Sequence, residues 1–150
     1  MNSTSHRLLL PTDRTVAGPK YSGDGQHLVV EYDHEEDDGS IAWSAVAFDD
    51  VLKFSYRQGA CCAAADILGA HELGCTQDSA LLREVVTRWQ ESVGWQEWQQ
   101  KQGGATRFKH YKLYFDDIGC VDVVAGNHNV KPVTSVATGL SAREGALVRE

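Results

Sequence analysis

Apolar and polar side chains alternate in the first third of the chain, which is the pattern of half-buried β-strands. From residue 28, every second position is apolar: Leu28, Val30 and Tyr32. Residues 41–48 and 51–56 are also strand-like, and short acidic segments separate these runs. We therefore predict an antiparallel meander over residues 27–56.

The period of the apolar pattern changes after Gly59. Residues 60–73 are rich in Ala and Leu, which predicts a short helix. A clearer helix is expected to begin near Asp78, a good N-cap residue, and to extend to about residue 92. Its apolar side chains recur at helical spacing: Leu82, Val85, Val86, Trp89 and Val93. This stripe is expected to pack on the sheet.

Strand-like alternation returns at residues 108–115. Residues 116–119 have the composition of a turn, and residues 120–125 form the return strand of a predicted hairpin. The order of three strands, a helix and two strands predicts an α+β fold. In it, an antiparallel β-sheet, formed by the meander and a C-terminal hairpin, packs against one or two mid-chain helices.

A chain of 150 residues has the usual size of a single domain. Residues 1–26 are dense in Pro and Gly, which predicts a loosely ordered N-terminal arm with one short edge strand near residues 8–10. Residues 127–150 form a polar C-terminal tail. In this tail the spacing of Ser141 and Glu144 fits a capping box that opens a short helix.

The composition restricts the expected partners and location. A formal net charge of −7 disfavours nucleic acid and anionic membranes, because binding to phosphates depends on Lys and Arg. No apolar run approaches the length of a membrane span, and residues 1–10 lack the features of a secretory signal. The 4 cysteines are too few for a disulfide framework. We therefore expect a cytoplasmic protein with free, mostly buried thiols.

The sequence contains no short motif of a nucleotide-binding loop, a zinc protease or a serine hydrolase, so neither a cofactor nor a catalytic residue is predicted. A small metal-assisted enzyme remains an alternative. His27 and Glu31 share a strand face close to His34, and His110 has basic neighbours. A Cys–His nucleophile also stays open. Candidate zinc ligands are Cys61 or Cys62, His71, Cys75, and either Cys120 or His110.

Charge is unevenly distributed along the chain. Residues 31–50 hold eight acidic side chains and no Lys or Arg, whereas residues 101–112 hold four basic side chains and no acid. If the acidic turns gather at one end of the meander, they focus a negative potential that speeds encounter with a basic protein. The residues predicted to bind this partner are Glu35, Glu36, Asp37, Asp38, Asp49 and Asp50.

Two tryptophans are predicted to support the same interface. Trp95 and Trp98 follow Gly94 and lie less clearly on the helical stripe than Trp89 does. Because tryptophan is enriched at interface centres, we expect Trp95 or Trp98 to anchor a partner or a second copy of the chain. A homodimer, or an assembly subunit that self-associates, is therefore a further alternative.

Three stretches together resemble a known group of proteins. They are residues 47–54 (AFDDVLKF), the helix start at Asp78 and Ser79, and residues 111–125 (YKLYFDDIGCVDVVA). This layout, over residues 27–126, resembles the small acidic immunity-type proteins of bacterial polymorphic toxin systems. The resemblance implies a non-enzymatic cytoplasmic protein that neutralises a toxin by covering its active site with an acidic surface. It carries over no catalytic residue.

Overall fold

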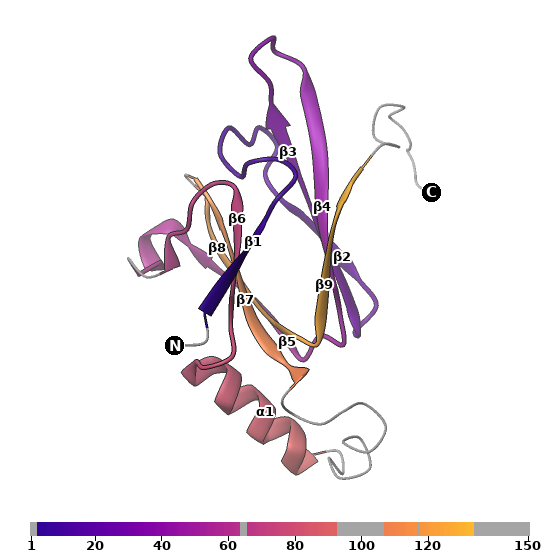
Figure 1. The fold of residues 1–150 in the computed structure, drawn as a ribbon, viewed down its shortest axis with the longest axis vertical. Coiled ribbons are helices and arrows are strands. Elements are labelled where there is room, and N and C mark those ends of the chain that lie inside the picture. Colours follow the sequence, from indigo (N-terminus) through magenta and orange to yellow (C-terminus); the bar gives the residue numbers. More distant parts are fainter. Residues whose placement is uncertain (1–2, 64–65, 93–106, 117, 134–150) are drawn as a thin grey trace.

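The computed structural model describes residues 3–63, 66–92, 107–116 and 118–133. These residues form two antiparallel sheets, with strand orders β1-β6-β7-β8-β5 and β2-β3-β4-β9 (Figure 1). The strands are β1 (Ser3–Arg7), β2 (Lys20–Gly23), β3 (His27–Glu35), β4 (Ile41–Asp49), β5 (Lys53–Gln58), β6 (Glu72–Thr76), β7 (Lys109–Phe115), β8 (Gly119–Ala125) and β9 (Asn127–Pro132). A short 3-10 helix, η1 (Gly59–Cys61), and an α-helix, α1 (Ala80–Ser92), are the helices of the described residues.

The main core lies between the two sheets. The alternation expected for the first predicted strand is confirmed, because Leu28, Val30 and Tyr32 of β3 all point into this core. Aromatic rings join the two layers: Tyr32 contacts Phe115 edge-on at 5.5 Å, and Phe48 contacts Tyr111 at 5.2 Å between ring centroids. Burial of these rings supplies the apolar contact that holds the sheets together.

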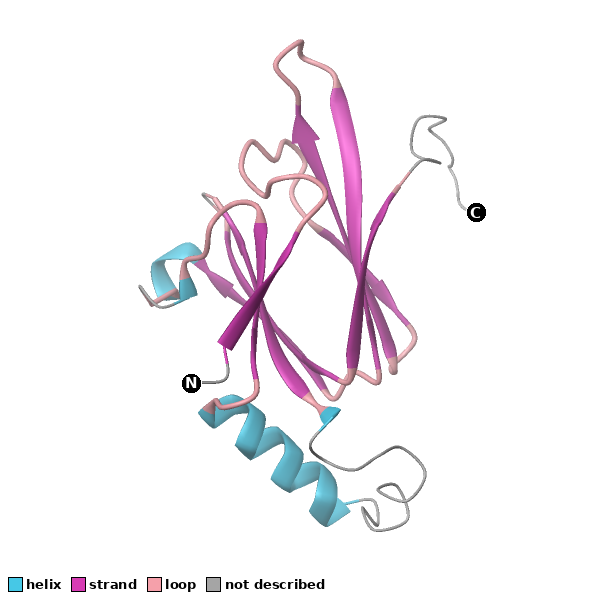
Figure 2. Ribbon diagram, in the orientation of Figure 1, coloured by secondary structure: helices cyan, strands magenta, loops and turns pink. Residues whose placement is uncertain are grey.

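Helix α1 packs against one end of the five-stranded sheet, below the strands in Figure 2. Its residues Leu82 and Val85 pack with Phe108 and Val124 in a second, smaller core. The predicted helix is confirmed, and its cap is Ser79 rather than Asp78, because the backbone N–H of Leu82 donates to Ser79 Oγ at 3.1 Å. Every residue of β8 is buried, with Val121 and Val123 in the main core and Val124 in the smaller one.

The fold is mostly β, which corrects the expected α+β class. The antiparallel pairing is confirmed, and so is the C-terminal hairpin of β7 and β8. The predicted single meander is wrong, because β5 leaves β4 and pairs with β8 in the other sheet. Asp50 marks this corner with a φ of 54°, a left-handed conformation that Asp tolerates better than most residues.

The helix predicted over residues 60–73 is also wrong. The described residues of this stretch, 60–63 and 66–73, form no α-helix; they include the end of η1 and the start of β6. Gly74 in β6 lies against the side chain of Leu68, where an added Cβ would come within 2.9 Å of Leu68 Cδ1. The Ala-rich composition favoured a helix, but pairing of β6 with β7 and β1 outweighs that local preference.

The predicted arm and the start of the predicted tail are parts of the sheets. β1 pairs with β6 and β2 pairs with β3, so residues 1–26 contribute a strand to each sheet. Leu8 is buried, and the hydroxyl of Tyr32 donates a hydrogen bond of 2.6 Å to the carbonyl of Leu10. β9 pairs with β4. The helix predicted at Ser141 and Glu144 lies outside the described residues. Among the described residues, no helix combines the length and the apolar character that a membrane span requires.

Candidate functional site

The most prominent surface feature is the hairpin of β3 and β4. The two strands pair over nine residues each, from His27 opposite Asp49 to Glu35 opposite Ile41. Figure 1 shows the tip of this hairpin extending beyond the neighbouring strands. We call residues 35–40 the acidic tip, because it contains Glu35, Glu36, Asp37 and Asp38.

Local hydrogen bonds hold the acidic tip in one conformation. The N–H of Glu36 donates to the carbonyl of Ser40 at 2.8 Å, and Gly39 adopts a φ of 87° that suits glycine. Asp38 Oδ1 accepts from the backbone N–H of Ser40 at 2.9 Å and from its hydroxyl at 2.6 Å. The turn is therefore preformed, and its carboxylates project from a fixed backbone.

Three of the four acidic residues of the tip, Glu35, Asp37 and Asp38, are exposed, and Glu36 is partly buried. The side chain of Asp37 is 98% exposed, although Arg14 forms an ion pair with it at 2.8 Å. The hydrogen bond from Arg14 lowers the pKa of Asp37, and the hydrogen bonds from Ser40 lower the pKa of Asp38. Asp37 and Asp38 therefore keep their negative charges at neutral pH, and Arg14 offsets one of them.

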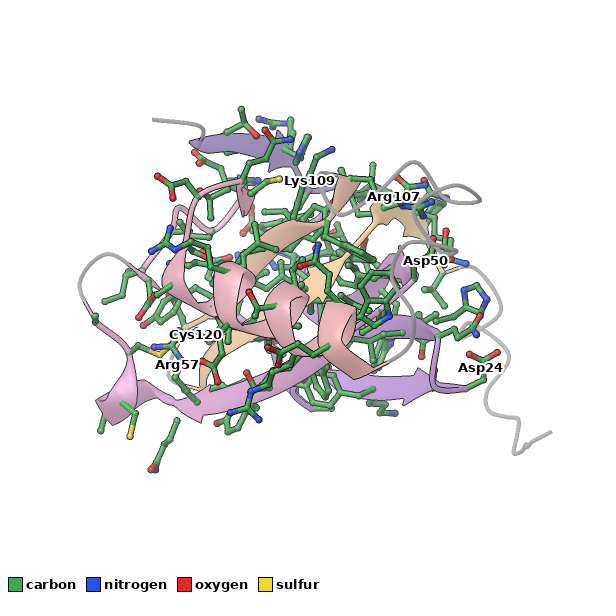
Figure 3. The ribbon with its side chains drawn as sticks, turned by 90° about the horizontal axis from the view of Figure 1, so that it is seen from below. Asp24, Asp50, Arg57, Arg107, Lys109 and Cys120 are labelled. Atoms are coloured by element: carbon green, nitrogen blue, oxygen red, sulfur yellow. A yellow bond between two sulfur atoms is a disulfide. The ribbon has the colours of Figure 1, made fainter. Side chains whose placement is uncertain are left out.

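The other predicted acidic residues lie far from the tip. Asp49 is at the opposite end of β4, and nine residues of strand span roughly 26 Å. Asp49 pairs with His27 Nδ1 at 2.8 Å, and Asp50 pairs with Arg107 (Figure 3). The expectation that the acidic turns gather at one end of the meander is wrong, because successive turns of antiparallel strands fall at opposite ends.

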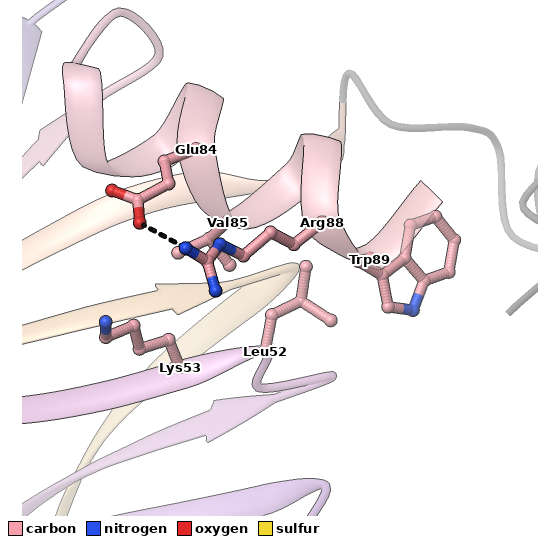
Figure 4. Close-up of a pocket in the computed structure, with 6 residues that line it drawn as sticks. All are labelled: Leu52, Lys53, Glu84, Val85, Arg88 and Trp89. Atoms are coloured by element: carbon pink, nitrogen blue, oxygen red, sulfur yellow. Dashed lines mark ion pairs between the residues drawn. The ribbon is translucent and has the colours of Figure 1, made fainter. Parts of the chain in front are cut away.

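The predicted aromatic anchors, Trp95 and Trp98, lie outside the described residues. Trp89 contacts Phe108 with 5.7 Å between ring centroids, as expected for a residue of the helical stripe. It also borders a groove of about 360 Å³ between α1 and the start of β5 (Figure 4). Glu84 and Arg88 form an ion pair at 3.5 Å along this groove.

The histidines considered for an enzyme are not brought together. His27 and His34 lie near opposite ends of β3, whereas His110 lies on β7 in the other sheet. His34 is buried, with its Nδ1 3.0 Å from the carbonyl oxygen of Asp13. Across the described ranges, no three His, Cys, Asp or Glu side chains come close enough to hold a metal ion.

The prediction of free thiols is wrong for two of the four cysteines. Cys62 and Cys120 form a disulfide that links the segment after β5 to β8, with 6.4 Å between their Cα atoms. Cys61 is a free, exposed thiol and Cys75 a free, buried one. Burial raises the pKa of Cys75, which keeps its thiol protonated and unreactive. The local sequence did not indicate the disulfide, because 58 residues separate its two halves.

A buried polar network lies on the outer face of the five-stranded sheet, beside α1. It joins six residues: Arg57, Asp66, Ser79, His110, Lys112 and Asp122. Arg57 donates to Asp66 Oδ2 at 2.7 Å and from Nε to Asp122 Oδ2 at 3.0 Å. Lys112 donates to Asp66 Oδ1 at 3.0 Å. The network ties the loop that carries Asp66 to strands β5, β7 and β8.

The charges of this network balance, since two cations face two carboxylates. Hydrogen bonds from Arg57 hold the pKa of Asp66 far below its usual value, although burial opposes the shift. Burial would raise the pKa of Asp122, but hydrogen bonds and charge from His110 and Arg57 outweigh it and lower the value. Both carboxylates are therefore ionised at neutral pH.

His110 lies between a hydroxyl and a carboxylate in this network. Its Nδ1 is 2.8 Å from Ser79 Oγ, and its Nε2 is 2.7 Å from Asp122 Oδ1. A pocket of about 300 Å³ opens beside them, lined by Leu68, Gly74, Thr76, Ser79, His110 and Lys112, among others. Of the residues that line this pocket, the sequence had indicated His110 and Cys75 as residues with candidate chemistry.

One sequence signal pointed toward the network. Asp122 is an acidic residue inside an otherwise apolar strand, and a buried carboxylate requires partners. Neither Arg57 nor Asp66 carried such a signal, because each looks locally like an ordinary surface residue.

Comparison with known protein families, curated proteins and solved structures finds no match to this chain.

Proposed function

We propose that this chain is a protein-binding domain that recognises a basic protein surface through the acidic tip. The observation that supports it is the preformed, projecting turn with four carboxylates and one nearby cation, Arg14. Together with the resemblance to immunity-type proteins, it favours neutralisation of a basic toxin by occlusion of its active site. This function does not require catalysis by the chain itself.

Electrostatics gives the tip a specific role in binding. A cluster of like charges attracts an oppositely charged surface before contact, which raises the association rate more than the final affinity. At physiological ionic strength, salt largely screens this attraction at distances beyond about 8 Å. Because the tip is rigid, little conformational entropy is lost when its carboxylates are bound.

The proposal uses only part of the predicted surface. Asp49 and Asp50 lie at the other end of the hairpin and already pair with His27 and Arg107. A partner that covers only the tip does not contact Asp49 or Asp50. These two residues bind the partner only if it also reaches the other end of the hairpin. Self-association remains the competing proposal, and light scattering of the purified chain distinguishes a stable dimer from a monomer.

The expected cytoplasmic location belongs to the same proposal. The Cys62–Cys120 disulfide bears against it, because disulfides persist mainly in oxidising compartments. Alkylation of thiols in acid-quenched cells shows whether Cys62 and Cys120 are oxidised or reduced in the cell. Labelling of Cys62 and Cys120 without prior reduction supports the cytoplasm, whereas labelling only after reduction contradicts it.

The binding proposal is tested by affinity capture from cells of the source organism, with mass spectrometry at low and high salt. The test variant is Glu35→Lys/Glu36→Lys/Asp37→Lys, which reverses three charges and retains Asp38, the residue that holds the turn. A matched control reverses three exposed acids elsewhere: Glu72→Lys/Glu84→Lys/Glu91→Lys. We expect a basic protein that the wild type and the control capture at low salt and the tip variant does not. Capture that is indifferent to the tip contradicts the proposal.

A further inference from the structure

Ser79, His110 and Asp122 form a continuous line of hydrogen bonds that no binding function requires. The distances are 2.8 Å from Ser79 Oγ to His110 Nδ1 and 2.7 Å from His110 Nε2 to Asp122 Oδ1. The three side chains come from three different elements: the N-cap of α1, strand β7 and strand β8. A hydroxyl, an imidazole and a carboxylate in this order are the components of an activated serine nucleophile.

The charge state of Asp122 fixes the direction of these hydrogen bonds. An ionised carboxylate only accepts, and the second oxygen of Asp122 is occupied by Arg57, whose Nη2 lies 2.9 Å away. His110 Nε2 must then carry the hydrogen, so in the neutral ring Nδ1 is the acceptor. Ser79 consequently donates its hydroxyl proton to His110 Nδ1, as a nucleophile does to its general base.

The rest of the network holds His110 in this orientation. Arg57 also binds Asp66, which Lys112 and the backbone N–H of Ala63 contact in turn, at 3.0 Å and 2.8 Å. Asp122 and Arg57 are thus positioning residues, because they act through His110. The imidazole cannot rotate without breaking a buried, charge-assisted hydrogen bond.

The hydroxyl of Ser79 is accessible to a small ligand. Ser79 is half-buried and, with His110, lines the pocket of about 300 Å³. This volume is at the low end of ligand sites, which favours a short acyl group. Leu68 and Gly74 supply apolar lining, while Thr76 and Lys112 supply polar lining. As the N-cap, Ser79 also lies at the positive end of the α1 dipole, which stabilises a negatively charged oxygen formed there.

We infer that Ser79, His110 and Asp122 form a hydrolytic site for small carboxylic esters, a function separate from recognition by the acidic tip. Ser79 Oγ attacks the acyl carbon and passes its proton to His110 Nδ1. The ester C–O bond breaks, and His110 returns the proton to the departing alkoxide, which leaves an acyl group on Ser79. Water then attacks this acyl group with His110 as base, which releases the carboxylic acid and restores the Ser79 hydroxyl. The sum is ester plus water to acid plus alcohol.

The test uses the purified full chain with two probes, p-nitrophenyl acetate and a fluorophosphonate. We expect a burst and slow turnover with the ester, and a fluorophosphonate adduct that peptide mapping places on Ser79. Ser79→Asn retains a good N-cap residue but has no hydroxyl, and should lower the ester rate at least about 100-fold and abolish the adduct. Ser22→Ala, an exposed serine on β2, is the matched control and should behave as the wild type.

A positioning role for Asp122 requires its own readout. Asp122→Asn should lower kcat by about 100-fold or more with little change in KM, because an amide no longer fixes the His110 tautomer. A rate that falls only in proportion to the unfolded fraction in circular dichroism would make the residue merely structural. The hydrolytic site itself is overturned if the folded wild type gives neither an adduct on Ser79 nor turnover above that of Ser79→Asn. Partner capture by Ser79→Asn stays at the wild-type level in either case, so the two proposals fail separately.

Discussion

Asp66 and Asp122 carry the negative charges of the polar network beside α1, and their surroundings link the stability of the fold to pH. Arg57 contacts both carboxylates, and Lys112 contacts Asp66. In the folded chain the pKa of each carboxyl group lies below its ordinary value. Asp37 and Asp38 of the acidic tip also have lowered pKa values, but solvent screens their contribution to stability.

The sign of the pH effect follows from these directions. A carboxyl group whose pKa is lower in the folded state stabilises the fold above the unfolded pKa of about 3.9. That contribution is lost as the pH falls toward the folded pKa. We therefore expect the free energy of unfolding, measured by urea denaturation, to fall steadily from about pH 5 downward.

A single variant assigns this effect to Asp66. Asp66→Asn should lower the free energy of unfolding by about 1–3 kcal/mol at pH 7, because it removes a charge that two cations contact. The loss of stability below pH 5 should then be smaller than in the wild type. Asp116→Asn, at an exposed turn, is the matched control. Equal slopes for the wild type and Asp66→Asn would show that other groups cause the acid sensitivity.

For individual residues, the sequence identified exposed charges better than buried ones. The carboxylates of the tip were predictable because a run such as residues 35–38 cannot be buried. The buried network was not, because Arg57, His110 and Asp122 meet only through the pairing of β5, β7 and β8. Ser79 was noticed as part of a helix start, and its second contact depends on the position of α1 over the sheet.

Individual elements followed the local pattern wherever that pattern was strong. The hairpin of β7 and β8 and the helix α1 were predicted close to their observed ranges, because alternation and helical spacing each persist over many residues. The region 60–73 was mispredicted because its Ala content describes only a local preference. The assignment of strands to sheets was not predictable, because paired strands can be far apart in the sequence, as β1 is from β6 and β5 is from β8.

The segment between β5 and β6 is the element whose stability depends on the disulfide. The bond between Cys62 and Cys120 spans 58 residues of sequence and fixes one end of the segment that carries Asp66. Reduction should lower the free energy of unfolding by about 2–4 kcal/mol, because the unfolded chain gains conformational freedom.

Denaturation with and without reducing agent measures this effect. Cys62→Ala/Cys120→Ala should have the stability of the reduced wild type, whereas Cys61→Ala should remain sensitive to reduction. Equal stability of the reduced and oxidised wild type would mean that the network alone anchors this segment.

The two sheets of the molecule carry the two proposed functional surfaces at separate places. The acidic tip extends from one end of the four-stranded sheet, whereas Ser79 and its pocket lie on the outer face of the five-stranded sheet. The predicted charge asymmetry therefore becomes local: the tip is acidic, and the acids at the opposite end of the hairpin are paired with His27 and Arg107. A partner steered by the tip approaches the projecting hairpin first.

The association rate of the captured partner tests this account most directly. Stopped-flow binding is measured against ionic strength for the wild type, for Glu35→Lys/Glu36→Lys/Asp37→Lys and for the control Glu72→Lys/Glu84→Lys/Glu91→Lys. We predict an association rate for the tip variant about 10-fold or more below that of the wild type at low salt, with the difference shrinking as salt rises. An unchanged association rate in the tip variant, or an equal loss in the control, would contradict recognition through the acidic tip.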